Sequence, residues 1–155
     1  MRHRKTYYSP IAITRIEEAR NAIRAHDYVA LNTMLAQGLN PNIPASDGRY
    51  LVHDAVTFDA GGTALDILAH YHADLDAQWA NYLNWTPAHI AWYMRRSDIV
   101  EKLKNLGADL EIEDARGWSA SRALPCPITR KEAELKFSSF ANMLGHTHDH
   151  AQVFA

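Results

Sequence analysis

The sequence has little of several things, and each shortage excludes a class of protein. Cys126 is the single cysteine among 155 residues, so no internal disulfide can form, and we expect a reducing, cytoplasmic location. No run of about 18 apolar residues occurs, and residues 1–8 lack the apolar core of a secretory signal, so we expect no membrane span and no membrane partner. Apolar residues still make up 47% of the chain, enough to bury a core.

Positive charge is scarce in the middle of the chain. Residues 27–124 contain seven Lys and Arg against thirteen Asp and Glu, whereas residues 1–26 contain six Lys and Arg against two Glu. Nucleic-acid-binding proteins usually present a basic surface, because neutralising phosphates supplies much of their affinity. We therefore expect no nucleic-acid partner, and we interpret the basic residues 1–13 as a solvated terminal segment.

Motifs for catalysis are also missing. Gly61 and Gly62 are not followed by the Lys-Ser/Thr pair of a phosphate-binding loop. Cys126 lies between two prolines, without a glycine-rich elbow or a helix N-terminus to activate the thiol. We therefore predict no catalytic residue, no cofactor and no enzymatic activity.

Histidine is abundant, with nine in the chain and the densest cluster at His146, His148 and His150. Alternate residues share one face only in a strand, and no second group of ligands is present to complete a tetrahedral site. We predict no metal site. A metal-binding protein or metal-dependent enzyme that uses these histidines remains the alternative function.

A motif near the middle of the chain is repeated along it. Residues 84–91 read Asn-Trp-Thr-Pro-Ala-His-Ile-Ala, and residues 107–110 read Gly-Ala-Asp-Leu, with seventeen residues between His89 and Gly107. Upstream, Gly48 and His53 lie 36 positions before Asn84 and His89. Downstream, residues 114–120, Asp-Ala-Arg-Gly-Trp-Ser-Ala, repeat the start of this motif 33 residues after Asn81. The upstream spacing of 36 residues is slightly longer than a repeat of about 33 residues, which predicts small insertions, one of them at the two glycines 61–62.

Residues 84–91 resemble the Gly-x-Thr-Pro-Leu-His-x-Ala opening of the ankyrin repeat family, and residues 107–110 resemble its Gly-Ala-Asp-Val turn. The resemblance implies an all-α solenoid of helix-turn-helix units with short hairpin fingertips and capping helices. It divides the chain into the basic segment 1–13, a repeat domain over 14–145 and a His-rich tail over 146–155. The units span roughly 14–46, 47–80, 81–113 and 114–145, with a capping helix over 129–144.

Stacking of neighbouring units is expected to supply the core, because one unit cannot bury its own apolar face. Thr86 is expected as a helix N-cap and Pro87 as the first helical residue. In the family the motif histidine hydrogen-bonds the threonine hydroxyl and nearby backbone, which implies structural roles for His53, Thr86, Pro87 and His89. The predicted core consists of Ile16, Ala19, Ile23, Leu31, Met34, Leu35, Ala55, Leu65, Ile67, Leu68, Ile90, Ala91, Ile99, Val100, Leu103 and Leu106.

Ankyrin proteins usually bind partners through the hairpin tips and the exposed side of the first helices, which form a concave surface. Aromatic residues, Met and Arg are enriched at interface hot spots, and this chain has several at those positions. Trp79 and Trp92 are instead expected to pack inside the fold. The predicted partner-binding residues are Arg49, Phe58, Tyr82, Leu83, Trp85, Tyr93, Met94, Arg116 and Trp118.

The sequence therefore predicts a non-catalytic protein-binding module, monomeric because its atypical ends resemble caps. Small acidic ankyrin proteins of bacteria often resemble immunity proteins, so a basic toxin is one expected partner. A secreted effector is a related alternative.

Overall fold

The computed structural model describes residues 8–59 and 61–122. Six α-helices occur in these residues: α1 (Pro10–Arg24), α2 (Tyr28–Ala36), α3 (Leu51–Phe58), α4 (Thr63–His70), α5 (Pro87–Tyr93) and α6 (Ser97–Asn105). The described part contains no β-sheet, and its extended pairings are two isolated bridges, Trp79 with Trp85 and Glu113 with Ser119. Within that part, the all-α prediction is confirmed.

Side chains at the helix starts explain several of these boundaries. The Ser9 hydroxyl accepts a hydrogen bond from the Ala12 amide and Pro10 follows as the first helical residue, so α1 begins four residues before the predicted start at 14. Asp27 caps α2 in the same way through the Ala30 amide. The N-cap of α4 is Gly62, and the carboxylate of Asp59, three residues earlier, accepts the Ala64 amide of its first turn at 2.7 Å.

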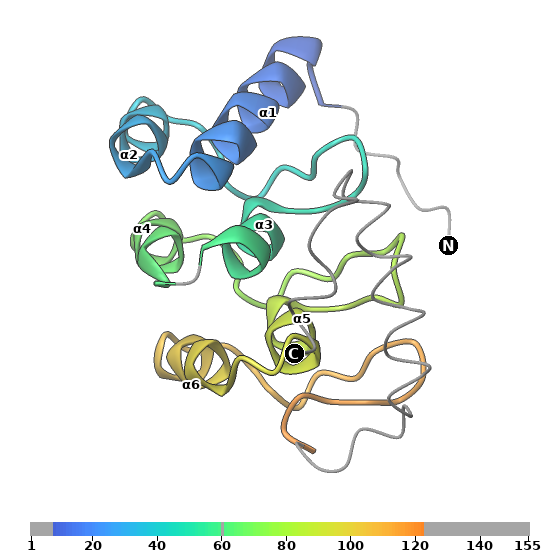
Figure 1. Ribbon diagram of the computed structural model, residues 1–155. Coiled ribbons are helices and arrows are strands. Elements are labelled where there is room, and N and C mark those ends of the chain that lie inside the picture. The colour runs from blue at the N-terminus through green and yellow to red at the C-terminus, as the bar shows by residue number, and fades with distance from the viewer. Residues whose placement is uncertain (1–7, 60, 123–155) are drawn as a thin grey trace. The chain divides into compact units, whose positions relative to one another are not determined.

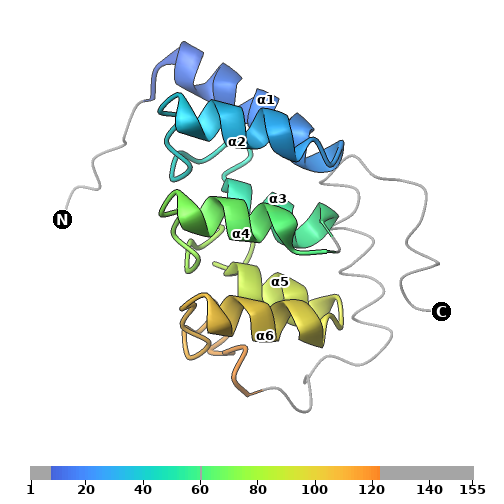
Figure 2. The ribbon, with the colours of Figure 1, turned by 90° about the vertical axis from the view of Figure 1, so that its left-hand side faces the viewer.

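Residues 8–121 stack their helices in pairs. The inner helices α1, α3 and α5 contact one another in sequence, and each contacts its outer helix, α2, α4 or α6 respectively. Figure 1 shows the outer helices on one side of this row and the connecting hairpins on the other. Figure 2 shows α2, α4 and α6 side by side on the outer face. The hairpins and the inner helices are therefore the elements that can form a concave binding surface.

The irregular repeat length has two structural sources. The step from Tyr50 to Thr86, the residues before α3 and α5, is 36 residues, and the step from Thr86 to Ser119 is 33. One extra residue lies in the loop between α3 and α4, which contains Gly61 and Gly62 as predicted. The other two lie in the second hairpin, which the Trp79–Trp85 hydrogen bond closes over seven residues, whereas the bonds Ala45–Arg49 and Asp114–Trp118 close the others over five.

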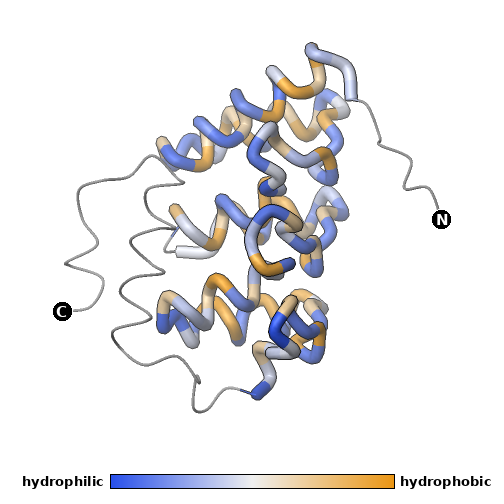
Figure 3. The backbone as a smooth tube through the Cα atoms, turned by 90° about the vertical axis from the view of Figure 1, so that its right-hand side faces the viewer, coloured by the Kyte–Doolittle hydropathy of each residue, from blue (hydrophilic) through white to orange (hydrophobic). Residues whose placement is uncertain are grey.

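The core follows the predicted pattern closely. Figure 3 shows apolar residues alternating with hydrophilic ones along the helices, as expected when each helix has one buried face. Twelve of the sixteen predicted core residues are buried, Ile16, Leu31, Leu65 and Leu103 completely. Met34, Ile67, Val100 and Leu106 are partly exposed.

Several predicted features fall outside the described residues. The capping helix over 129–144, the His-rich tail 146–155 and Cys126 all do, as does most of the fourth unit, of which only residues 114–122 are described. Among the described residues, none of the helices has the length and hydrophobicity that crossing a membrane requires.

Candidate partner-binding face

The three hairpins are tied to one another by hydrogen bonds. The Trp79 indole and the Asn81 amide both donate to the Asp47 carbonyl, at 3.0 and 2.9 Å, and this joins the first hairpin to the second. The Leu83 carbonyl accepts the Ala115 amide at 2.8 Å, which joins the second to the third. The hairpin row therefore has a fixed geometry.

The motif histidines connect each unit to the next one. The backbone amide of Thr86 donates to His89 Nδ1 at 3.1 Å, so that nitrogen carries no proton, and Nε2 donates to the Trp118 carbonyl at 2.7 Å. The Thr86 hydroxyl also contacts Nδ1 at 2.8 Å and receives the His89 amide, and Pro87 is the first residue of α5. The hydrogen bonds implied by the resemblance are present between His89 and Thr86, and Pro87 is the first helical residue as expected.

His53 makes the same contacts although Tyr50 and Leu51 replace the Thr-Pro of the motif. Its Nδ1 accepts the Tyr50 amide at 3.1 Å, and its Nε2 donates to the Trp85 carbonyl at 3.0 Å. Burial lowers the pKa of His53 to about 4, and burial lowers the pKa of His89 as well. Both rings are neutral at pH 7, as this hydrogen-bonding pattern requires.

Two predicted partner-binding aromatics lie inside the fold. Trp85 is 2% exposed and Tyr93 is 8% exposed, so the expectation that they line an open surface is wrong. The Trp85 ring lies between Tyr82 and Tyr93, with centroids 5.1 and 5.2 Å away, and its indole donates to Asp114 at 3.1 Å. Trp79 is also buried, as predicted, and Tyr82 stacks on it at 5.1 Å. Trp92, expected inside the fold, is partly exposed.

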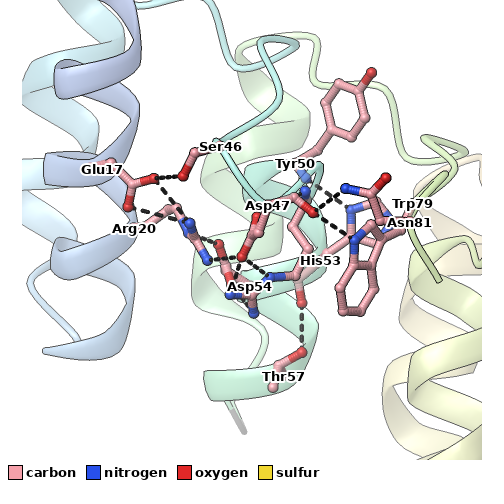
Figure 4. Close-up of polar contacts among 11 residues, drawn as sticks. Glu17, Arg20, Ser46, Asp47, Tyr50, His53, Asp54, Thr57, Trp79 and Asn81 are labelled. Atoms are coloured by element: carbon pink, nitrogen blue, oxygen red, sulfur yellow. Dashed lines mark hydrogen bonds and ion pairs between the residues drawn. The ribbon is translucent and has the colours of Figure 1, made fainter. Parts of the chain in front are cut away.

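Arg49 also lies inside the fold, contrary to the prediction. It is 2% exposed and is bonded to Asp47 and Asp54. Figure 4 shows these two carboxylates together with Arg20, the other member of this charged group, between α1 and α3. The Arg49 guanidinium donates to Asp54 at 3.0 Å and to Asp47 at 2.7 Å. Arg20 donates to the other oxygen of Asp54 at 2.6 Å and to Asp47 at 2.9 Å. Arg49 therefore has a structural role.

The charges in this group compensate one another. Burial alone would raise the pKa of Asp47, but hydrogen bonds from Arg49 and the charges of Arg49 and Arg20 outweigh burial and hold it below its usual value. Burial alone would lower the pKa of Arg20, but Asp54, Asp47 and Glu17 outweigh it and raise it. Asp54 is fully buried, and burial raises the pKa of its carboxyl although the charges of Arg49 and Arg20 oppose this rise, so its carboxylate requires both guanidinium groups beside it.

The sequence contains a signal for this group of buried charges. Arg20 lies at the helical spacing of the apolar residues Ile16, Ala19 and Ile23, where a charge is out of pattern. Asp54 likewise interrupts the apolar run of α3. A buried position occupied by a charge requires a partner of opposite sign.

Six of the nine predicted binding residues keep some exposure, and they form two separate groups. Tyr82, Leu83, Arg116 and Trp118 lie in the second and third hairpins. Phe58 ends α3 and Met94 follows α5, at the opposite end of the inner helices from the hairpins. The Arg24 guanidinium lies 5.0 Å from the Phe58 ring centroid, a contact that the sequence did not indicate.

In the third hairpin, Arg116 and Trp118 are held by one carboxylate. Asp114 accepts the Arg116 guanidinium at 2.9 Å and the Trp118 amide at 3.0 Å. The Trp118 ring lies 6.5 Å from the Trp92 ring. Arg116 remains exposed and Trp118 partly exposed, so this hairpin presents a cation and a large aromatic in a fixed arrangement.

The exposed surface of the described residues is acidic. Four exposed side chains are basic, Arg95, Lys104, Arg116 and Arg122, against nine that are acidic. The nine are Glu18, Asp27, Asp66, Asp74, Asp98, Glu101, Asp109, Glu111 and Glu113. Such an imbalance attracts partners of positive charge.

Helix pairs stacked through their inner helices and joined by hairpins, with a histidine of one unit bonded to the next, define a helical repeat protein of the ankyrin type. The structure is similar to the ankyrin repeat domain of Bcl-3, a member of the IkappaB protein family, with a TM-score of 0.62 over 77% of this chain and 17% sequence identity. The chain spans about half the length, 50%, of that structure. Neither a protein-family model nor a curated protein sequence matches the chain. The chain thus has the ankyrin repeat fold, as the sequence predicted.

In residues 8–59 and 61–122, no three His, Cys, Asp or Glu side chains gather in a way that could hold a metal ion. The histidine cluster His146, His148 and His150 lies outside the described residues.

Proposed function

We propose that this chain is a non-catalytic module that binds a basic protein through the tips of its second and third hairpins. Ankyrin repeat domains generally serve as protein–protein interaction modules. Tyr82, Leu83, Arg116 and Trp118 supply the contacts, and the acidic surface supplies long-range attraction. Neutralising a basic toxin is the specific form of this function that fits the charge.

The observation that supports this proposal most is the partial exposure of Trp118. The equivalent residues of the other two hairpins, Arg49 and Trp85, are buried and bonded within the fold, whereas Trp118 is partly exposed. Asp114 accepts its amide and His89 donates to its carbonyl, so its backbone is held, and its ring lies 6.5 Å from the Trp92 ring. A large aromatic held in this way loses little entropy on binding, which is typical of a hot spot.

The matched pair Trp118→Ala and Trp85→Ala tests this proposal. Partners are captured on the immobilised full-length chain from cells of its native source and identified by mass spectrometry, and their affinity is measured with purified proteins. We expect Trp118→Ala to weaken binding by about 2 kcal/mol with little loss of stability. We expect Trp85→Ala mainly to lower the free energy of unfolding, by about 3–5 kcal/mol, because its ring is in the core.

Ionic strength tests the electrostatic part. Association with a basic partner should slow as salt rises, since the Debye length falls from about 10 Å at 0.1 M to about 3 Å at 1 M. Rates that do not depend on salt would remove the basic partner from the proposal. A Trp118→Ala variant that binds every captured protein at full strength would remove the hairpin surface.

A further inference from the structure

Asp59, the residue that follows α3, is a buried carboxylate whose bonded partners are neutral. It is 1% exposed. One of its oxygens accepts the Ala64 amide at 2.7 Å, and the other accepts the Tyr28 hydroxyl at 2.9 Å and the Gly61 amide at 3.3 Å. A buried charge ordinarily requires a partner of opposite sign. Among the described residues, the one ion pair of this carboxylate is with Nδ1 of His26, at 4.0 Å, and His26 is charged only when it is protonated.

The Tyr28 hydroxyl lies between the ring and the carboxylate. It is 3.4 Å from His26 Nδ1 and it donates its single proton to Asp59. This bond to Asp59 raises the pKa of Tyr28, so the hydroxyl keeps its proton. A hydrogen bond between Nδ1 and the Tyr28 oxygen therefore requires a proton on Nδ1. Nε2 is then the nitrogen that takes up a further proton from solvent, and the His26 side chain is 53% exposed.

Three other charged side chains belong to the elements around this ring. Arg24, at the end of α1, lies over an aromatic ring at 5.0 Å, and Asp27 accepts an amide of α2 at 3.0 Å. Arg96, before α6, donates to the backbone carbonyls of Val56 and Asp59 at 2.9 and 3.3 Å. Arginine and aspartate side chains ordinarily keep their charge between about pH 5 and 8, whereas histidine changes its charge in this range. His26 is therefore the group through which pH changes the charge beside Asp59.

We infer that His26 is a pH-sensitive contact, and that proton uptake by its ring makes it the counterion of Asp59 and tightens the junction between the first and second helix pairs. His26 lies in the loop between α1 and α2, and Asp59 in the loop between α3 and α4. A charge-assisted hydrogen bond is shorter and stronger than a neutral one, so the protonated ring should move closer than the present 4.0 Å. This contact goes beyond the proposed function and does not depend on any partner.

The sign of the effect follows from the charge. A protonated ring is attracted to Asp59 in the folded chain and has no such neighbour in the unfolded one. The stabilisation is therefore present in mildly acidic solution and is lost as the pH rises. This is opposite to the effect of His53, whose buried ring must stay neutral, so acid strengthens one junction of the stack while it weakens the next.

Hydrogen exchange of the α2 amides in the full-length chain tests this inference, with His26→Asn as the variant. Asparagine removes the charge and tolerates the left-handed backbone of residue 26, which has φ of +56°. Protection factors, corrected for intrinsic exchange, are compared between wild type and variant at pH 7.5 and 5.5. We expect their ratio to rise about twofold to fivefold on acidification, as for a partly exposed ion pair. Because both chains contain His53 and His89, the ratio cancels the contributions of these two rings.

His72→Asn is the matched control. His72 is also an exposed histidine with a left-handed backbone, φ +61°, but it makes no ion pair with a carboxylate in the described part of the chain. Its ratio should not change with pH. A second control is the Asp59→Asn background, in which His26→Asn should also have no pH-dependent effect.

Three results would overturn the inference. The first is a ratio for His26→Asn that is the same at both pH values. The second is an equal rise for His72→Asn, which would show that any exposed histidine in such a loop has this effect. The third is a rise that persists in the Asp59→Asn background, because the carboxylate would then not be the partner of the ring.

Discussion

The two junctions between inner helices are built differently. Between α1 and α3, Arg20 and Arg49 share the buried carboxylate of Asp54. Between α3 and α5, side chains donate to backbone carbonyls instead: the His53 ring to Trp85, the Trp79 indole to Asp47, and the Arg96 guanidinium to Val56 and Asp59. The first junction therefore depends on charge compensation within a buried ion group, and the second on hydrogen bonds from side chains to backbone carbonyls.

This difference shows that one repeat architecture accepts two kinds of interface chemistry. A buried ion pair contributes little net stability, because desolvation offsets the attraction, but removing one partner leaves an uncompensated charge. A neutral hydrogen bond contributes about 1 kcal/mol and leaves a smaller defect when it is broken. The first junction should thus be the more sensitive to single substitutions and the second the more sensitive to protonation of its histidine.

The largest effect is expected from Asp54→Ala. This variant leaves Arg20 and Arg49 without their shared carboxylate in a buried site, and we expect the free energy of unfolding to fall by about 3–5 kcal/mol. Urea denaturation measures this fall in the free energy of unfolding. The exposed pair Lys102–Asp66, at 2.7 Å, is the control, and Asp66→Ala should cost about 0–1 kcal/mol. Equal losses in the two variants would show that the burial of Asp54 is not what makes the first junction sensitive to substitution.

Acidification should weaken the second junction. The pKa of His53 is about 4 in the folded chain and about 6.5 in an unfolded one, so below pH 6.5 the unfolded state binds more protons. The stability present at pH 7 is lost as the pH falls from 6.5 through 4, by about 3 kcal/mol in all. Denaturation at a series of pH values measures this slope. His53→Gln should flatten it, and an unchanged slope in that variant would exclude His53 as the cause.

A smaller effect is expected from His89→Ala. It removes the bond to the Trp118 carbonyl and the acceptor for the Thr86 amide, and we expect a loss of about 1–3 kcal/mol in the free energy of unfolding. Thermal or urea denaturation measures this loss, and partner binding by the folded variant should weaken less than in Trp118→Ala, because the Trp118 side chain is still present. Near-wild-type stability together with lost binding would instead make His89 part of the binding site.

The sequence predicted the fold from features that act locally. The N-cap Thr86 with Pro87, the histidine spacing and the apolar periodicity each specify a backbone conformation within a few residues, and the structure has all of them. The loop insertion at Gly61 and Gly62 was predictable for the same reason, because glycines mark places where a chain can lengthen.

The exposure of site residues was harder to predict, because it depends on contacts between units. Arg49, Trp85 and Trp118 occupy equivalent hairpin positions, yet two are buried and one is partly exposed. Arg49 is buried because Arg20 and Asp54, from other positions in the chain, complete a charge network around it. Trp85 is buried because the longer second hairpin places Tyr82 against it. The position of a residue within its repeat predicts neither the burial of Arg49 nor that of Trp85.

The bond from each motif histidine to the following hairpin gives the chain a direction. His53 meets its acceptor, the Trp85 carbonyl, 32 residues later, and His89 meets the Trp118 carbonyl 29 residues later. A ribosome that has released only the residues up to about 80 has produced a helix whose buried histidine still lacks that acceptor. Each newly synthesised hairpin thus completes the unit made before it, so folding during translation should advance one unit behind synthesis.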